Sequence, residues 1–352
     1  MQKIVKREIF RNMVSDIQNF DPTDVAVPNG NFFAFPYTVE QADIVLVAVP
    51  WDVTTSFRAG TVLGPKAIIA ASGQMDLFDF KIPDAWKIKI ATSPYSIELE
   101  EHSSDLRIIS EKIIQTQEKG ETVDMTTELA MVNKACDSLN KLIYRKTAAL
   151  LEQKKLVGLV GGEHSVPLGF IQALGDYHQD FGILHIDAHA DLRQGYEGFE
   201  YSHASIMFHA SRCKSVSKIV QVAVRDLGHH EVEYAAATPS IKQFPDVILK
   251  ENIFKGFTWQ QQCEQIIAEL PDKVYISFDV DGLLPSLCPA TGTPVPGGLS
   301  FDQAMFLIET LCKSGKTIIG FDLCETAPDE YDAIIGANVL FRLALFMYQS
   351  NL

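Results

Sequence analysis

The chain has 352 residues, of which 47% are hydrophobic and 21% are charged, and its formal net charge is −15. This composition is ordinary for a globular protein, whereas the acidic balance argues against nucleic acid and anionic membranes as partners. We find no apolar run of the roughly 18 to 20 residues that a membrane span needs, no signal-peptide core and no paired cysteines, so we expect a cytoplasmic protein without a membrane segment.

Residues 1–42 show no strong hydrophobic period and contain the turn signal Asn29-Gly30, so we expect an N-terminal arm packed on the main domain. Residues 43–352 alternate strand-like apolar runs with helix-like patterns and contain no obvious linker. This alternation favours a single α/β domain, built from a mostly parallel sheet with helices on both faces.

The first half of that domain has clear elements on either side of one unclear region. Residues 44–49 form a strand-like apolar run, and a helix is expected to begin near Pro65, because proline is tolerated in the first turn. Residues 80–120 are hard to interpret, and 88–91 is the best candidate for a strand there. The apolar period over 127–153 predicts a long amphipathic helix.

Three apolar runs, at 156–160, 181–184 and 275–278, are each followed by side chains that can bind metal. Side chains at i, i+2 and i+4 of an extended chain point the same way, so the carboxylates and the imidazole after the second run should converge. Carboxylates held that close repel one another unless a cation lies between them. The three strand ends offer six candidate ligands: His164, Asp187, His189, Asp191, Asp279 and Asp281.

Four carboxylates and two imidazoles suit two metal ions of borderline hardness such as Mn(II), and the same ligands admit Ni(II). A structural zinc site would depend on cysteine, and no cysteine lies in these clusters. A lone Asp-x-His is usually part of a surface loop. Because doubly wound sheets place sites at the carboxyl ends of their strands, three such clusters together predict a binuclear metal site.

The second half of the chain continues the α/β alternation. A glycine-containing loop over 193–202 leads to a helix and to a strand at 219–224, and a long proline- and glycine-rich loop occupies 284–298. The last predicted strand, 317–324, is followed directly by Glu325. A closing helix is expected from about residue 331 to residue 349.

Several separated motifs, taken together and in order, resemble the ureohydrolase (arginase/agmatinase) family over roughly residues 43–348. They are Pro50-Trp51-Asp52, Thr61-Val62-Leu63-Gly64-Pro65, Gly161-Gly162-Glu163-His164-Ser165, Asp187-Ala188-His189-Ala190-Asp191, Asp279-Val280-Asp281-Gly282 and Pro294-Val295-Pro296-Gly297-Gly298-Leu299-Ser300. The resemblance implies a three-layer α/β/α domain with a roughly eight-stranded sheet. It also implies a homo-oligomer, either a trimer or a hexamer.

The same resemblance implies two Mn(II) ions per chain, which lower the pKa of a bound water and so supply hydroxide near neutral pH. The hydroxide would attack a guanidinium carbon. Two aspartates, Asp187 and Asp279, would bridge the ions. Each ion would then be completed by one histidine and one aspartate, namely His164 with Asp191 and His189 with Asp281.

Three further roles follow from the matched positions. Glu325 stands where the family has a carboxylate that grips the guanidinium. His203 matches a histidine that contacts the substrate and gives a proton to the leaving amine. We count Asp191 among the catalytic residues as well as the ligands, and Arg193 could supply a cation to the far end of the substrate.

The resemblance narrows the substrate less firmly. The stretch 191–198 is similar to agmatinases of one bacterial type, whereas Leu192-Arg193 and Gly228 replace groups with which arginases hold free arginine. We therefore expect an amidinohydrolase of polyamine metabolism that cleaves a small cationic guanidino substrate, with agmatine as the expected one, to urea and an amine. Arginase, guanidinobutyrase, guanidinase and formiminoglutamase activities are the alternatives within the same chemistry.

A non-catalytic metal-bound paralogue with a regulatory or scaffold role is the alternative of another class. Two departures from the family motivate it: the lack of an Asp-x-Gly-Asp-like element in residues 80–120, and Leu284 where the family usually has aspartate. The complete set of six ligands, together with His203 and Glu325, favours an enzyme.

Overall fold

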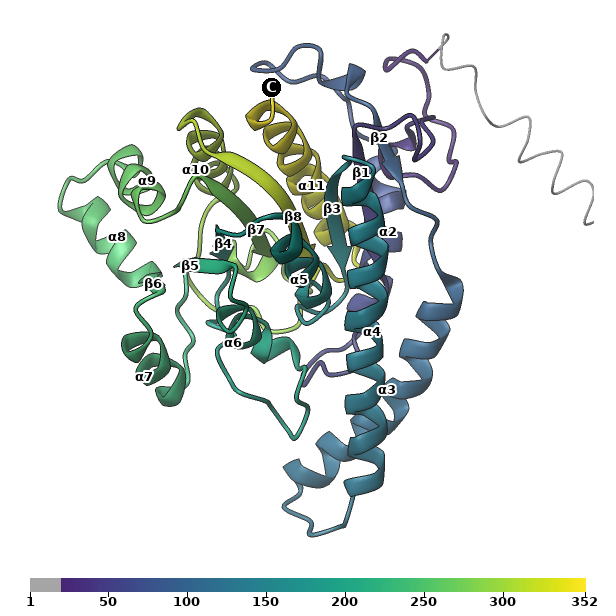
Figure 1. Ribbon diagram of the computed structural model, residues 1–352, viewed down its shortest axis with the longest axis vertical. Coiled ribbons are helices and arrows are strands. Elements are labelled where there is room, and N and C mark those ends of the chain that lie inside the picture. The colour runs from purple at the N-terminus through teal and green to yellow at the C-terminus, as the bar shows by residue number, and fades with distance from the viewer. Residues whose placement is uncertain (1–19) are drawn as a thin grey trace, which may run out of the picture.

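A computed structural model describes residues 20–352 of the chain (Figure 1). Its centre is one sheet of eight parallel strands, which confirms the expected α/β architecture. In spatial order the strands are β2 (Ile90–Thr92), β1 (Ile44–Val49), β3 (Leu156–Gly161), β8 (Thr317–Cys324), β7 (Lys273–Asp279), β4 (Phe181–Ile186), β5 (Val216–Val222) and β6 (Ile241–Phe244).

Two groups of packed helices cover the sheet, which gives three layers (Figure 1). One group is α2 (Gly64–Ser72), α9 (Trp259–Ala268), α10 (Phe301–Lys313) and α11 (Glu330–Ser350). The other is α3 (Ile97–Glu118), α4 (Thr126–Glu152), α5 (Leu168–Tyr177) and α6 (Ile206–Ser211), and the sheet edge at β6 is flanked by α7 (His229–Ala237) and α8 (Asp246–Phe254). Every residue of β1 and β4 is buried, which explains why both strands are apolar except at His185.

The strand order reverses at the centre of the sheet. After β3 the chain crosses to β4, and β7 and β8 later fill the space between these two strands. All four strands are parallel and therefore end at the same edge of the sheet. Open α/β sheets bind their ligands outside the carboxyl ends of the strands at such a reversal point.

The unclear region contains an element that the sequence did not indicate. Its strand is β2, which begins two residues later than the expected 88–91, and the long helix α3 follows it. Two of the five buried positions of α3 are serines, so the apolar period that would have revealed the helix is interrupted. The buried residues of α3 are Ser103, Leu106, Ser110, Ile113 and Ile114.

The expected extended geometry after β4 is wrong in part. The strand ends at Ile186, and Asp191 adopts a left-handed backbone conformation with φ of 53°. The backbone carbonyl of Asp191 accepts hydrogen bonds of 3.0 Å from the N–H groups of Met207 and Phe208 at the start of α6. A tight turn anchored on α6, and not a strand, therefore brings the side chains of this segment together.

The predicted N-terminal arm lies partly outside the described residues, which begin at Phe20. Within the described part, Phe32, Phe33 and Phe35 are buried. The ring centroid of Phe33 lies 5.1 Å from that of Phe341 on α11. These aromatic residues belong to the main hydrophobic core. The boundary at residue 42 therefore stays a prediction.

One described helix, α11, is long and apolar enough to pass a composition test for a membrane span, contrary to the expectation that no run would qualify. Its most apolar window has a mean hydropathy of 1.3, and 61% of that window is buried inside the protein. The helix packs against β8, α2 and α10. Its apolar character therefore serves the core.

Candidate active site

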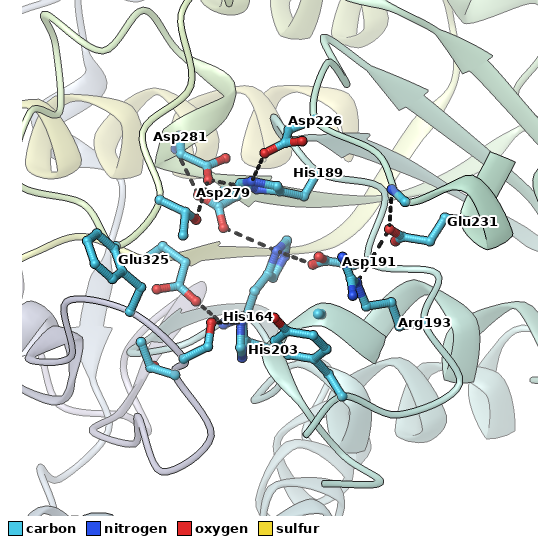
Figure 2. Close-up of a pocket in the computed structure, with 18 of the residues that line it drawn as sticks. His164, His189, Asp191, Arg193, His203, Asp226, Glu231, Asp279, Asp281 and Glu325 are labelled. Carbon is cyan, nitrogen blue, oxygen red and sulfur yellow. Dashed lines mark hydrogen bonds and ion pairs between the residues drawn. The ribbon is translucent and has the colours of Figure 1, made fainter. Parts of the chain in front are cut away.

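Side chains that follow the four central strands meet at the carboxyl edge of the sheet (Figure 2). His164 lies three residues beyond β3, Asp187 follows β4 directly, Asp279 ends β7 and Glu325 follows β8 directly. The parallel register of these strands brings residues distant in sequence into one cluster. All six candidate ligands from the sequence belong to this cluster.

The imidazole of His164 is surrounded by carboxylates. Its Nδ1 lies 3.0 Å from Asp187 Oδ2, 3.3 Å from Asp191 Oδ2 and 3.4 Å from Asp279 Oδ2. A single ring N–H can satisfy one of these oxygens, so the other two face the same nitrogen without a shared proton. Three carboxylates and an imidazole nitrogen around one point are a candidate donor set for one metal ion.

A second group lies beside the first. His189 Nδ1 is 3.0 Å from Asp281 Oδ2 and 3.5 Å from Asp187 Oδ1. The two oxygens of Asp187 therefore face different histidines, Oδ2 toward His164 and Oδ1 toward His189. This geometry supports the expected role of Asp187 as the bridge between two ions.

Burial and mutual repulsion make it unfavourable for all carboxylates of the cluster to be ionised at once. Burial, and then the Asp187 carboxylate, raise the pKa of Asp191 to about 6. Burial, and then Asp281 and Asp187, raise the pKa of Asp279 well above its usual value. Burial disfavours a charged His189, but the Asp281 and Asp187 carboxylates dominate and raise its pKa to about 12. The shifts of Asp191, Asp279 and His189 have the sign expected of a site short of positive charge, whereas burial is outweighed at Asp187 by His185, His164 and His189, which lower the pKa of Asp187 well below its usual value. A cluster of carboxylates that depends on neighbouring positive charge in this way fits divalent cations.

Glu325 follows β8 directly, lines the cavity and shares a left-handed backbone conformation with Asp191. Its φ is 64°, a left-handed value that is uncommon outside glycine and clusters at functional sites. Its backbone N–H donates to Gly162 O at 2.7 Å, and its carbonyl accepts from Thr291 Oγ1 at 2.8 Å. Its Oε1 accepts from the backbone N–H of His164 at 2.8 Å, which leaves Oε2 facing the pocket.

The cluster forms the floor of a cavity of about 270 Å³. Figure 2 shows Glu325 on one side of the cluster and Arg193 on the opposite side. Residues from separate loops and from α7 complete the wall, including several to which the sequence gave no role: Thr55, Ser56, Phe57, Tyr196, Asp226, Leu227, Glu231, Gly292 and Thr293.

Arg193 lines the cavity, and its positive charge is paired with the carboxylate of Glu231. Its Nε lies 3.5 Å from Glu231 Oε2, and its guanidinium sits 4.5 Å from the centre of the Tyr196 ring. Glu231 is buried, and it also accepts backbone N–H bonds from Leu192 at 3.0 Å and Gly228 at 2.9 Å. A different carboxylate, Asp226, is exposed at the cavity mouth and lies 4.0 Å from His189 Nε2.

His203 is held by the loop that follows β1. Its backbone N–H donates to Thr54 Oγ1 at 3.1 Å, and its Nε2 lies 3.3 Å from Ser56 Oγ. The fully buried Glu163 carboxylate fixes this loop by accepting from Thr54 N at 2.8 Å and Thr54 Oγ1 at 2.9 Å. Burial, and then the charge on His189, lower the pKa of His203 to about 4. Its imidazole is therefore neutral near pH 7.

The unpredicted helix α3 braces the same loop from outside. Ser103 Oγ accepts from Asp52 N at 3.1 Å, Ser110 Oγ donates to Val53 O, and Arg107 donates to the carbonyls of Val53 and Thr55. No residue of the 80–120 region lines the cavity in the part of the chain that the structure describes. The region therefore contributes support for His203 and no ligand.

The sequence profile described as "Arginase family" matches residues 42–346. The chain belongs to the arginase family. Over 295 residues it is 30% identical to the N(1)-aminopropylagmatine ureohydrolase of Thermus thermophilus, with 84% of this chain and 85% of that protein covered. Over 320 residues it is 28% identical to the guanidinobutyrase of Pseudomonas aeruginosa, with 88% and 87% covered.

A solved structure supports the same fold. The agmatine ureohydrolase of Thermoplasma volcanium has a TM-score of 0.68 and 22% identity, with 94% of this chain and 96% of that chain covered. As an arginase-family member the protein is a hydrolase of amidine carbon–nitrogen bonds, and proteins of the family use a binuclear metal centre. The candidate ligands of this centre are the two clusters described above, one around His164 and one around His189, each made of carboxylates and an imidazole.

The structure places one of the two departures from the family, Leu284. Leu284 lies in the loop after β7, where its backbone N–H donates to Leu299 O at 2.9 Å. Four buried side chains beneath the ligands were given no role from the sequence, although one of them, His185, shares the two-residue spacing of the ligand segment. They are His185, Gln221, Ser277 and Asp322.

Proposed function

We propose that this arginase-family protein is a binuclear manganese amidinohydrolase that cleaves agmatine, or an agmatine extended at its far end, to urea and an amine. The observation that carries the proposal is the charge arrangement of the cavity. A cation-binding cluster lies on the floor, the carboxylate of Glu325 lies beside it, and the exposed carboxylate of Asp226 lies at the mouth. Arg193, the cation at the rim, is already paired with Glu231.

The reaction adds water to the guanidinium carbon and breaks its bond to the alkyl nitrogen. Two divalent cations, when bound by the six ligands, would supply hydroxide near neutral pH. Glu325 would hold the planar guanidinium through its free Oε2, because a carboxylate matches both the charge and the N–H geometry of that group. Orientation of the carbon toward the cluster contributes to the rate by proximity.

His203 would move the proton that the alkyl amine needs in order to leave. Its imidazole lines the cavity and is neutral at pH 7, so it can accept a proton and pass it to the departing nitrogen. Ser56 Oγ, at 3.3 Å from Nε2, and Thr54, at the backbone N–H, fix the orientation of the ring. The products are then urea and a free amine.

Substrate choice follows from what the far end of the cavity offers. Agmatine is arginine without its carboxylate, and it carries an ammonium group at the far end. Asp226 would attract that ammonium, whereas the pairing of Arg193 with Glu231 weakens any attraction for a carboxylate. The Thermus relative, which is named for an extended agmatine, supports this choice. The guanidinobutyrase relative makes guanidinobutyrate the competing substrate to be measured.

The metal and the setting complete the proposal. Mixed carboxylate and imidazole ligation suits Mn(II), and Ni(II) would fit the same donors. By family resemblance we propose a cytoplasmic homo-oligomer, a trimer or a hexamer.

The decisive measurement is urea release from agmatine, N(1)-aminopropylagmatine, guanidinobutyrate and arginine by protein loaded with Mn(II) or Ni(II). We expect kcat/KM for agmatine to exceed that for arginine by at least about tenfold, or roughly 1.4 kcal/mol of discrimination. A preference for arginine or guanidinobutyrate would overturn the assigned substrate. Urea from none of the four, with either metal bound, would overturn the whole proposal.

A further inference from the structure

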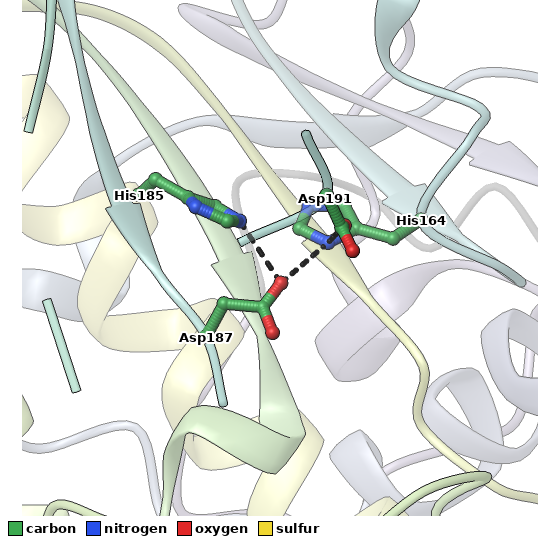
Figure 3. A group of neighbouring side chains, drawn as sticks. All are labelled: His164, His185, Asp187 and Asp191. Atoms are coloured by element: carbon green, nitrogen blue, oxygen red, sulfur yellow. Dashed lines mark hydrogen bonds and ion pairs between the residues drawn. The ribbon is translucent and has the colours of Figure 1, made fainter. Parts of the chain in front are cut away.

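A row of polar side chains, half-buried at Gln243 and fully buried at Gln221 and His185, crosses three neighbouring strands and ends at Asp187. Gln243 of β6 pairs in register with Gln221 of β5, and Gln221 pairs with His185 of β4. Gln243 Nε2 donates to Gln221 Oε1 at 2.9 Å, and Gln221 Nε2 lies 2.9 Å from His185 Nδ1. His185 Nε2 lies 2.9 Å from Asp187 Oδ2 (Figure 3). Gln221 and His185 are fully buried, and the reaction described above does not use them.

The partners of Gln221 determine which nitrogen of His185 carries the proton. Gln221 Nε2 also lies 2.6 Å from the carbonyl oxygen of Ala190, which can only accept a hydrogen bond. That end of the Gln221 side chain is therefore the NH₂ group. Because an NH₂ group can only donate, His185 Nδ1 must accept, and the ring proton is on Nε2, directed at Asp187 Oδ2.

This tautomer orients Asp187 without any metal. Oδ2 of Asp187 accepts from His185, and Oδ1 accepts from the backbone N–H of His189 at 2.6 Å. Two fixed donors on different oxygens prevent the carboxylate from rotating. Because His185 donates as a neutral ring, it adds no positive charge that would repel a cation.

The second proton of the Gln221 amide holds the ligand turn itself. Ala190, whose carbonyl it binds, stands between His189 and Asp191. One buried amide therefore secures the backbone between two candidate ligands and, through His185, the carboxylate of a third. A site whose supporting contacts are already made needs less rearrangement when an ion binds.

We propose that Gln221 and His185 are positioning residues that fix Asp187 and the turn from His189 to Asp191, and so set the affinity of the metal centre. The inference rests on the proposed binuclear centre. It also decides the status of His185, which lies close enough to His164, Asp187 and Asp191 to be counted as a ligand. Both of its ring nitrogens are engaged with protein groups, so it orients a ligand and does not bind the metal.

The test uses titration calorimetry to compare the Mn(II) affinity of the metal-free parent chain with that of each metal-free variant. Gln221→Met keeps the side-chain length and removes both donors, and His185→Leu removes the donor to Asp187. Both should weaken Mn(II) binding roughly 10- to 100-fold, the loss typical of residues that orient metal ligands, while two ions still bind at saturation. His185→Gln can accept from Gln221 and donate to Asp187, so it should stay within about threefold of the parent by the same reasoning.

Gln262→Met is the matched control for loss of a buried glutamine. Gln262 is also buried, donates to Leu249 O at 3.2 Å and accepts from Asn252 Nδ2 at 3.2 Å, but it lies on α9 away from the cluster. Its replacement should lower the unfolding temperature and leave the Mn(II) affinity unchanged. A merely structural role for Gln221 would give the same result as this control and would overturn the inference.

A second measurement uses the parent chain and does not depend on the folding of any variant. The ¹⁵N shifts of the histidine rings report the tautomer, with the His185 signal assigned by its loss in His185→Gln. We expect the proton on Nε2, and a proton on Nδ1 would overturn the inference. Loss of one Mn(II) equivalent at saturation in His185→Leu would make His185 a ligand and would also overturn it. If the parent binds no Mn(II), the proposed centre fails as well, whereas parent binding with unchanged affinity in Gln221→Met refutes this inference alone.

Discussion

Replacing Glu325 by glutamine should remove the charge that binds the guanidinium while leaving the metal ligands in place. The side chain is buried, and its Oε1 accepts from the backbone N–H of His164 at 2.8 Å. Glutamine can keep that hydrogen bond through its own Oε1, so His164 should not shift. The substitution therefore separates the charge of Glu325 from its structural contact.

The size of the effect follows from the oxygens that remain for the substrate. Oε2 is free, and Oε1 keeps one lone pair, so Glu325 can form about two hydrogen bonds with a guanidinium. Hydrogen bonds to a charged group contribute roughly 1.5–3 kcal/mol each and neutral ones roughly 0.5–1.5 kcal/mol. The NH₂ group of glutamine cannot accept, so the bond at Oε2 is lost and the bond at Oε1 becomes a neutral one, which together weaken binding by about 2.5–4.5 kcal/mol. At about 1.4 kcal/mol for each factor of ten, kcat/KM should fall roughly 60- to 2 × 10³-fold.

The assay is steady-state urea release with the best guanidino substrate, together with elemental analysis of the same preparations. Glu309→Gln is the matched control. Glu309 is also buried, but it lies on α10, away from the cavity, and pairs with Lys81 and Lys313. It should behave as the parent does. Parent-like kcat/KM in Glu325→Gln, with metal retained, would refute the guanidinium-binding role. A fall that follows metal loss would show that Glu325 acts through His164.

Two further predictions concern the cluster and the proton shuttle. Asp187→Ala and Asp279→Ala should each lose most of the bound metal, because each would serve both ions, and elemental analysis that finds full retention in both would contradict the ligand assignment. His203→Ala should keep the metal and substrate binding while kcat falls roughly 10- to 10⁴-fold, and parent-like turnover would exclude the shuttle. Because the pKa of His203 is lowered from 6.5 to about 4, the fold favours its neutral form. The stability of the parent relative to His203→Gln, measured by urea unfolding, should be greatest above pH 6.5 and fall as the pH drops toward 4.

The fold and the cluster were accessible from sequence because both depend on local patterns. The strands β1 and β8 begin and end at the predicted residues, since β1 is a continuous apolar run and β8 is apolar except at Thr317 and Asp322. The six candidate ligands follow strand ends, and parallel strands bring such positions together without any detailed knowledge of packing. The same patterns identified the family, which the profile match confirms.

The parts that the sequence did not reveal depend on contacts between distant segments. The function of Gln221 comes from its strand register with His185 and from the approach of the Ala190 carbonyl, and neither is visible from spacing. The pairing of Arg193 with Glu231 joins residues 38 positions apart across the cavity wall. Even the ligand segment converges through a left-handed turn at Asp191 instead of the extended geometry that its spacing suggested.

The crowding of carboxylates explains why the site can be recognised from the sequence. It also explains why many hydrogen bonds from the surrounding protein are needed to hold these carboxylates in place. Asp191, with its pKa raised to about 6, is more easily ionised in an unfolded chain, so its burial opposes folding at neutral pH until a cation arrives. Asp279 and Glu325 are shifted in the same direction. In the metal-free fold, the charged imidazole of His189 offsets part of this repulsion, and neutral contacts such as the amide of Gln221 and the backbone N–H that binds Glu325 orient the surrounding groups. The carboxylates that allow the cluster to bind cations are therefore also the reason that it needs a rigid neutral framework beneath it.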